Sequence, residues 1–199
     1  MTSRELEGTA DRPIRVLFVC TGNSARSQMA EALLRHLGGP AFEPFSAGTE
    51  PKGIHPLTLR VLEEAGIDAT GARSKPVTEF LDASFDYVVT VCDRARESCP
   101  VFTGADVSLH WGFDDPAAAT GTEDERRAVF ERVLGEITRR LRTFIPLALR
   151  EHGRVAGRAA ELDHATAGER DRAAAELDRT AAELDRTAVP AADRGRPPD

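Results

Sequence analysis

The sequence lacks the features that mark membrane-spanning, secreted or general nucleic-acid-binding proteins. It has no apolar run of about eighteen residues, so we expect no membrane span. Residues 1–12 are polar and lack the hydrophobic core of a signal peptide. The formal net charge is −7 and the pI about 5.3, whereas general binders of nucleic acid or anionic membranes are more often basic. We therefore expect a cytoplasmic protein with no nucleic-acid or membrane partner.

Cysteine is scarce, with three in 199 residues: Cys20, Cys92 and Cys99. This number excludes a disulfide scaffold. In a reducing compartment, such cysteines are more often buried, metal-binding or catalytic. None of the five histidines stands at a metal-ligand spacing. We therefore expect no metal site.

Short apolar runs alternate with helical patterns over residues 13–150. The predicted strands cover 14–19, 41–47, 85–91 and 107–110. The predicted helices cover 26–37, 55–65 and a last segment that begins at a capping-box pair, Thr122 and Glu125. Pro146 should kink or end this last helix. The alternation predicts an α/β fold with a four-stranded parallel sheet flanked by helices.

The composition changes after Arg150, where Ala, Glu, Asp and Arg dominate. The sequence AAELDRT at 174–180 is repeated at 181–187, but one leucine per repeat is too few for a stable coiled coil. We therefore expect a flexible N-terminus at 1–12, one domain at 13–150 and a low-complexity tail at 151–199. The tail should be disordered or transiently helical, and the protein a monomer. A weak partner-binding or self-association helix is the alternative for the tail.

The segment from Cys20 to Ser27 directly follows the first predicted strand and opens the first predicted helix. Its backbone N–H groups can point inward as an anion nest, and the helix N-terminus adds positive potential. Arg26 offers a planar fork for two oxygens of a tetrahedral oxyanion. The same field favours the thiolate of Cys20, and Ser27 can donate a hydrogen bond to it. The predicted binding residues are Thr21, Gly22, Asn23, Ser24, Ala25, Arg26 and Ser27.

Cys92 follows the third predicted strand as Cys20 follows the first. Ligands of parallel sheets bind beyond the carboxyl ends of the strands. We therefore expect Cys20 and Cys92 at the same edge of the sheet. The alternative is that both are structural cysteines.

The stretch CTGNSARSQMAEALL, residues 20–34, resembles the active-site signature of arsenate reductases built on the low-molecular-weight tyrosine phosphatase fold. The resemblance extends from about Ile14 to Leu149. It implies that Cys20 is the nucleophile and that Arg26 binds the oxyanion. It also implies a low-molecular-weight phosphotyrosine phosphatase-like fold.

Two further segments resemble the same family. VTVCDRARESCP, residues 89–100, resembles its redox pair of cysteines, and HWGFDDPA, residues 110–117, places Asp115 where the family has a general acid. The resemblance implies a relay in which Cys92 attacks the Cys20 sulfur and Cys99 then attacks Cys92. A thioredoxin-like protein reduces the resulting disulfide, with no bound cofactor. The alternatives are inert loop cysteines and an Asp115 that only shapes a turn.

Some members of this family hold a potassium ion with Asn, Glu, Ser and Asp side chains. Asn23, Glu31 and Ser46 match the first three, while the Asp position falls on Lys75. The resemblance therefore implies that a lysine ammonium replaces the ion and orients Asn23.

The predicted function is reduction of arsenate to arsenite in arsenic detoxification, with weak phosphatase activity on the side. The main rival is a low-molecular-weight protein tyrosine phosphatase, which needs Cys20, Arg26 and Asp115 alone. Phosphatases usually place an aromatic residue after Asp-Pro, whereas residues 117–119 are all alanine, which favours an inorganic oxyanion. The sequence is also compatible with reduction through a small-thiol adduct and with a non-catalytic oxyanion or redox sensor.

Overall fold

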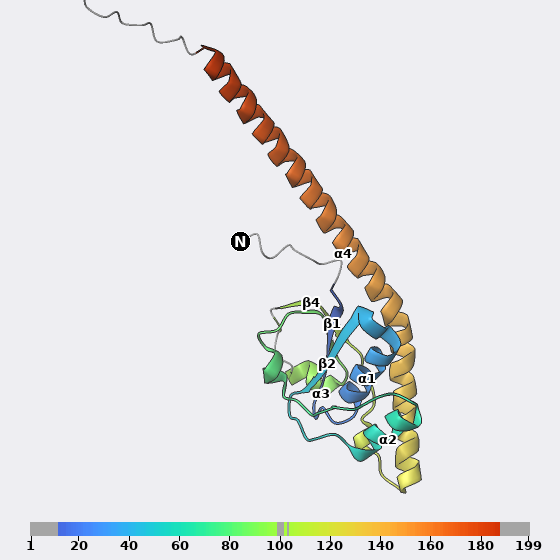
Figure 1. Ribbon diagram of the computed structural model, residues 1–199. Helices are drawn as coiled ribbons and strands as arrows, with labels where there is room; N and C mark the ends of the chain where they lie inside the picture. The colour runs from blue at the N-terminus through green and yellow to red at the C-terminus, as the bar shows by residue number, and fades with distance from the viewer. Residues whose placement is uncertain (1–11, 99–101, 103, 188–199) are drawn as a thin grey trace, which may run out of the picture. The chain divides into compact units, whose positions relative to one another are not determined.

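The computed structural model describes residues 12–98, 102 and 104–187, with side chains as far as Val155. Within these residues it contains a parallel sheet of four strands in the order β2-β1-β3-β4 (Figure 1). The strands are β1 (Ile14–Cys20), β2 (Phe42–Gly48), β3 (Phe85–Thr90) and β4 (Ala105–His110). The predicted four-stranded parallel sheet is confirmed, and each strand lies within two residues of its predicted bounds.

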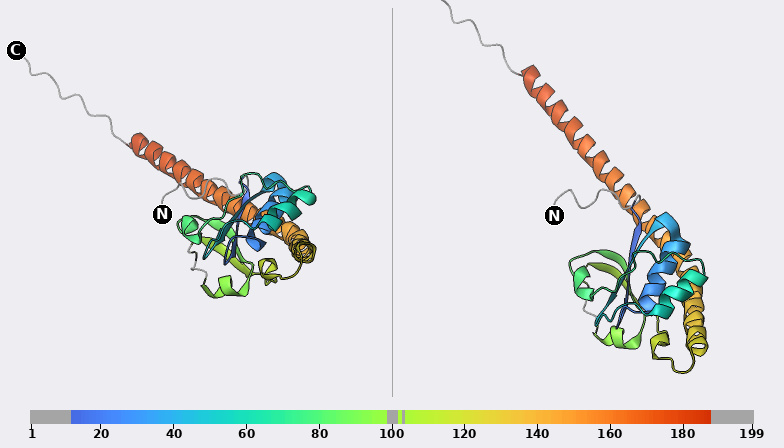
Figure 2. Two further views of the ribbon diagram at one scale, coloured as in Figure 1. Left: turned by 90° about the horizontal axis from the view of Figure 1, so that it is seen from below. Right: turned by 60° about the horizontal axis from the view of Figure 1, so that its bottom comes forward.

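The strands are connected by helices. These are α1 (Arg26–Gly38), α2 (Pro56–Glu64), α3 (Asp93–Ser98) and α4 (Glu123–Thr187), with short 3-10 turns η1 (Gly39–Ala41), η2 (Val77–Phe80) and η3 (Pro116–Ala118). Helices α1 and α2 and the beginning of α4 lie on one side of the sheet (Figures 1 and 2). The short α3 and the 3-10 turns were not predicted from the sequence.

The core lies on both faces of the sheet. Strand β1 is central and is buried along almost its whole length, as its continuous apolar sequence predicts for a parallel strand. Helix α4 buries a stripe at helical spacing against the sheet. Its buried residues are Phe130, Val133, Leu134, Ile137, Leu141, Phe144 and Ala148.

Helix α4 begins as predicted but does not end where expected. Thr122 and Glu125 form a reciprocal capping box: the Thr122 N–H donates to Glu125 Oε2 at 2.8 Å, and the Glu125 N–H donates to Thr122 Oγ1 at 3.3 Å. The helix does not end at Pro146, which was one of the two predicted effects of this proline, because α4 continues to Thr187. Proline removes one backbone donor, while Phe144 and Ala148 on either side of it are buried in the core and keep the helix in place.

The chain divides into two units. One comprises Gly8–Gly153 and contains the sheet, and the other includes the residues from Arg154 onward. Helix α4 contributes to both, and residues 151–187 are helical. That residues 151–199 form a tail outside the domain at 13–150 stays a prediction. Within the described part of the chain, no helix has the length and apolar character that a bilayer crossing requires.

Candidate active site

The loop between β1 and α1 is held from outside by the segment that follows β2. Backbone N–H groups of this segment donate to carbonyl oxygens of the loop at 2.8 to 3.2 Å. The pairs are Thr49 to Cys20, Glu50 to Thr21, Lys52 to Gly22 and His55 to Ser24. The carbonyl groups are thus satisfied away from the loop's interior, as expected of an anion nest whose N–H groups point inward.

The sulfur of Cys20 lies inside this loop and is almost fully buried, at 2% exposure. The Asn23 N–H donates to Cys20 Sγ at 3.1 Å, and Ser27 Oγ lies 3.0 Å from the same sulfur. Asn23 has a φ of 44° and is the only non-glycine residue with positive φ in the described part of the chain. Asparagine tolerates this left-handed conformation better than most residues. The turn therefore directs a backbone donor at the sulfur.

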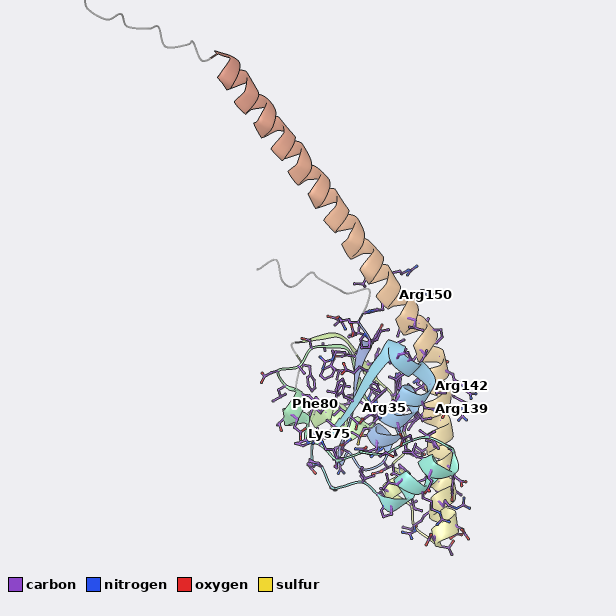
Figure 3. The ribbon with its side chains drawn as sticks, in the orientation of Figure 1. Arg35, Lys75, Phe80, Arg139, Arg142 and Arg150 are labelled. Carbon is purple, nitrogen blue, oxygen red and sulfur yellow. The ribbon has the colours of Figure 1, made fainter. Side chains whose placement is uncertain are left out.

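Behind the loop, Lys75, Glu31 and Ser46 form a buried polar cluster. Lys75 Nζ lies 3.2 Å from Glu31 Oε2, and the two side chains are 10% and 13% exposed. Ser46 Oγ donates to the same carboxylate oxygen at 2.5 Å. Lys75 is labelled in Figure 3, and its backbone carbonyl accepts a hydrogen bond from Gly48, at the end of β2. The ammonium and the Ser46 hydroxyl thus meet at the same oxygen of Glu31, as the family resemblance implied.

Asn23 connects this cluster to the Cys20 sulfur. A carboxylate only accepts hydrogen bonds, so Ser46 must donate to Glu31 and accept from Asn23 Nδ2 at 2.9 Å. The other Nδ2 proton goes to Ser27 Oγ at 2.8 Å. The hydroxyl proton of Ser27 is then free to point at Cys20 Sγ. Cys20 Sγ can thus accept two hydrogen bonds, one from the Asn23 N–H and one from the Ser27 hydroxyl.

Arg26 lies at the start of α1 and is 8% exposed. Its Nη2 lies 3.1 Å from Asp115 Oδ2, and its Nη1 donates to the Phe113 carbonyl at 3.2 Å. Among the residues that the structure describes, its buried Nε has no hydrogen-bond partner. The guanidinium is therefore fixed at the loop with a donor to spare for an oxyanion.

Asp115 approaches the loop from the segment that follows β4. It precedes η3, where its Oδ1 accepts from the Ala117 N–H at 3.2 Å, and its side chain is 46% exposed. The adjacent Asp114 faces Arg132 at 3.3 Å instead. Of the two carboxylates, Asp115 is therefore the one in contact with Arg26. Its role as general acid stays a prediction.

Cys92 lies just beyond the end of β3 and is 4% exposed. Its sulfur is 3.5 Å from Thr21 Oγ1 and accepts a hydrogen bond from the Ala95 N–H at 3.4 Å. Cys20 and Cys92 therefore lie at the same edge of neighbouring strands, and both are free thiols. Cys99 lies outside the described residues.

These side chains surround one pocket of about 580 Å³. Its lining residues are Cys20, Thr21, Gly22, Ser24, Ala25, Arg26, Lys52, Cys92, Asp93, Arg94, Phe113, Asp114, Asp115, Ala117 and Ala118. The sequence did not single out Lys52, Asp93 or Arg94. Each follows the carboxyl end of a strand in the sequence. This position could have identified them as pocket residues, because ligands of parallel sheets bind at that edge. In the described part of the chain, no group of His, Cys, Asp and Glu side chains is arranged to hold a metal ion.

His55 is a further titratable group close to the loop. Its ring stacks on Phe130 with the centroids 4.8 Å apart, and its Nδ1 accepts from the Leu57 N–H at 3.1 Å. Burial lowers the pKa of His55, the positive charge of Arg126 lowers it further, and Asp115 opposes the shift. The imidazole is therefore neutral at neutral pH and serves as the N-cap of α2.

The comparisons with known proteins agree with this arrangement. Residues 15–155 match the family described as low molecular weight phosphotyrosine protein phosphatase, and the chain belongs to this family. It is 43% identical over 129 residues to an arsenate reductase of Halalkalibacterium halodurans, which covers 65% of this chain and 93% of that protein.

Two solved structures show the range of chemistry on this fold. A thioredoxin-dependent arsenate reductase of Corynebacterium glutamicum is 36% identical, with a TM-score of 0.53 and coverage of 72% of this chain and 67% of that one. An arginine phosphatase of Geobacillus stearothermophilus is 26% identical, with a TM-score of 0.57 and coverage of 70% and 95%. The fold alone therefore does not decide between reduction and phosphate hydrolysis.

Proposed function

We propose that this protein is an arsenate reductase that uses Cys20 as nucleophile and passes electrons through Cys92 and Cys99. The observation that carries the proposal is the buried thiol of Cys92, 3.5 Å from Thr21 Oγ1 in the wall of the pocket that holds Cys20. Phosphate hydrolysis needs no second thiol, whereas reduction of an oxyanion needs two electrons. The arsenate reductases among the relatives support the same assignment.

In the first step, the loop from Thr21 to Ser27 binds arsenate, with its amides and Arg26 stabilising the negative charge. The Cys20 thiolate attacks arsenic and forms an S–As bond. One oxygen leaves as water, with its proton supplied by Asp115. Arsenic remains in its pentavalent state at this point.

In the second step, the Cys92 thiolate attacks the sulfur of Cys20. The S–S bond forms as the S–As bond breaks, and the electron pair of the broken bond stays on arsenic. Arsenic becomes trivalent and leaves as arsenite, while two thiols have become one disulfide. Cys99 then attacks Cys92, which releases Cys20 as a thiolate and leaves a Cys92–Cys99 disulfide.

An external dithiol returns the two electrons to the Cys92–Cys99 disulfide. A thioredoxin-like protein fits this role, because it reduces exposed disulfides by the same exchange. The relay needs a reducing thiol pool, which places it in the cytoplasm.

Phosphotyrosine hydrolysis is the alternative on the same loop. It uses Cys20, Arg26 and Asp115, so we expect weak activity on aryl phosphates. Ala117 and Ala118 form the pocket wall after the Asp-Pro pair, where an aromatic side chain would grip a phenol ring. This wall suits a small inorganic oxyanion better.

The test is an NADPH-coupled assay with thioredoxin, thioredoxin reductase and arsenate. The variant Cys99→Ser should release about one arsenite per enzyme and then stop, trapped with a Cys20–Cys92 disulfide that peptide mass mapping detects. Cys20→Ser is the matched control and should release none. Steady-state turnover by Cys99→Ser would refute the three-cysteine relay.

A further inference from the structure

We propose that His110 is a positioning residue that holds Cys92 in place for its attack on the Cys20 sulfur. The inference rests on the proposed reductase function. His110 is the last residue of β4, the strand next to β3, and it does not line the pocket. Neither oxyanion binding nor the first attack by Cys20 requires it.

The imidazole of His110 contacts a residue on each side of Cys92. Its Nδ1 lies 2.9 Å from the hydroxyl of Thr90, the last residue of β3. Its Nε2 lies 3.0 Å from a carboxylate oxygen of Asp93, the first residue of α3. One side chain thus bridges the two ends of the segment 90–93, which carries the thiol.

Both contacts are satisfied whether or not the imidazole is protonated. A carboxylate only accepts, so Nε2 carries a proton and donates to Asp93. With Nδ1 bare, the Thr90 hydroxyl donates to it. With Nδ1 protonated, Thr90 accepts and its hydroxyl proton turns to the Leu109 carbonyl at 3.4 Å. The bridge is therefore a permanent support and does not depend on a change of pH.

This segment needs support because the sheet ends there. The pairing of β3 with β1 ends at Thr90, and the Val91 N–H makes one more hydrogen bond, to Val19. Beyond that point, the Cys92 carbonyl accepts a hydrogen bond from the Arg96 N–H of α3 at 3.1 Å, and its sulfur accepts one from the Ala95 N–H at 3.4 Å. Its contact with the nucleophile loop is the 3.5 Å distance to Thr21 Oγ1. The position of Cys92 therefore depends on how α3 is held. Disulfide formation brings two Cβ atoms to about 3.8 Å. A small displacement of Cys92 should therefore slow its attack.

The bridge lies beside the backbone at Gly112. A Cβ atom there would reach ordinary van der Waals contact, 3.4 Å from His110 Nε2 and 3.6 Å from Asp93 Oδ1. Asp93 itself is 84% exposed, so the pair adds little to stability and acts instead through geometry.

The experiment compares two reactions of one enzyme. Hydrolysis of p-nitrophenyl phosphate uses Cys20 without Cys92, while single-turnover arsenite release in the Cys99→Ser background requires Cys92. In that background, His110→Ala should slow arsenite release about ten- to a hundredfold. It should change phosphate hydrolysis by less than about twofold. His110→Gln, whose amide can donate to Asp93 and accept from Thr90, should restore much of the rate.

Two controls distinguish loss of the His110–Asp93 contact from a general loss of structure. His36→Ala removes an exposed histidine from the last turn of α1 and should leave both reactions unchanged. Asp93→Ala and His110→Ala should give similar defects in arsenite release that do not add in the double variant, because both remove the same contact. Parallel loss of both reactions, or unchanged arsenite release, would overturn the proposal.

A third readout does not depend on arsenate. The rate at which iodoacetamide alkylates Cys92, followed by peptide mapping, should rise in His110→Ala because the segment is released. An unchanged rate would count against the bridge. If the Cys99→Ser parent releases no arsenite, the proposed function fails, while the alkylation rate still decides whether His110 holds Cys92.

Discussion

Asn23 is the residue on which the candidate site most depends. Its N–H donates to Cys20 Sγ, its Nδ2 donates to Ser27 and Ser46, and its Oδ1 accepts from the Lys75 N–H at 2.7 Å and from Gln28 at 2.9 Å. Only an amide has donors and an acceptor on one short side chain. The same residue therefore fixes the loop's turn, orients the thiol's hydrogen bonds and connects both to the buried cluster.

Lys75 should make the enzyme indifferent to the alkali cation. Its ammonium lies against Glu31 in the buried cluster, which leaves no charge deficit for an ion to fill. Exchange of sodium for potassium at constant ionic strength should leave turnover and melting temperature unchanged. A potassium-specific rise in melting temperature would contradict this, because binding to the folded state alone raises stability.

The variant Lys75→Met sharpens this prediction. Removal of one partner of a buried ion pair costs up to about 3–5 kcal/mol. Glu31 would then keep only Arg35, a half-exposed side chain whose Nη2 lies 2.7 Å from Glu31 Oε1. The melting temperature should fall and become sensitive to the alkali cation. Lys52→Met, on an exposed lysine, is the control for stability and should do neither.

At the scale of elements, the end of β2 and the nucleophile loop are packed without spare room. A Cβ atom on Gly48 would lie 2.7 Å from the Thr21 carbonyl oxygen and 2.8 Å from the Asn23 nitrogen. Both neighbours are backbone atoms, which cannot move without displacing the loop. The close approach of this strand thus sets the position of the N–H that points at Cys20.

Gly48→Ala should therefore impair both activities together. Overpacking of this kind costs roughly 1–3 kcal/mol. Displacement of the Asn23 N–H from Cys20 Sγ should slow phosphate hydrolysis and arsenate reduction alike. Gly153→Ala, where a Cβ meets nothing within 4 Å, is the control and should leave both rates unchanged, with a small gain in stability because alanine favours the helix. The prediction fails if Gly48→Ala keeps wild-type rates. The measurements are kinetics and thermal unfolding.

Most elements could be predicted from the sequence because their signals are local. Short apolar segments identified the strands, and the Thr122–Glu125 pair identified the start of α4. The end of α4 could not be predicted, because tertiary burial around Pro146 outweighs the local cost of proline. The six-residue α3 has no hydrophobic period to detect.

The site was predicted in part for the same reason. Cys20, Arg26 and their loop form one contiguous motif, so their proximity follows from the chain itself. The contact between Arg26 and Asp115 and the bridge from His110 to Asp93 join residues from different strand ends. Such pairs depend on strand order and loop conformation, which the sequence pattern does not specify.

At the scale of the molecule, Asp86 connects distant parts of the Gly8–Gly153 unit. Arg12 donates two hydrogen bonds to its carboxylate at 2.8 Å, the Arg15 N–H donates a third at 2.7 Å, and His152 Nδ1 of α4 lies 3.9 Å away. Burial alone raises the pKa of Asp86. The hydrogen bonds from Arg12 and Arg15 and the charges of Arg12 and His152 outweigh burial, so the net shift is downward.

The protein should therefore lose stability in acid through Asp86. A carboxyl group with a lowered folded-state pKa stabilises the fold above its unfolded pKa of about 3.9, and this contribution is lost as the pH falls through the folded value. Asp86→Asn should lower the melting temperature at pH 7 and flatten its decline below about pH 4. Asp82→Asn, on an exposed aspartate, is the control. If the melting temperature of Asp86→Asn declined below about pH 4 as steeply as that of the wild type, other carboxyl groups would account for the loss of stability in acid.

Removal of the chain after Val155 should leave catalysis nearly unchanged. The cut preserves His152 beside Asp86 and the last buried residues of α4, and it coincides with the end of the family match at residue 155. Residues 156–199 contain no cysteine and three leucines, Leu162, Leu177 and Leu184. So few apolar groups cannot offset an ordering cost of roughly 1–2 kcal/mol per residue, so the segment should add little to the fold. Turnover, melting temperature and sedimentation of the truncated and full chains are the measurements. A several-fold loss of turnover, or a change in oligomeric state, would show that the AAELDRT repeats bind a second copy or a partner and belong to the working protein.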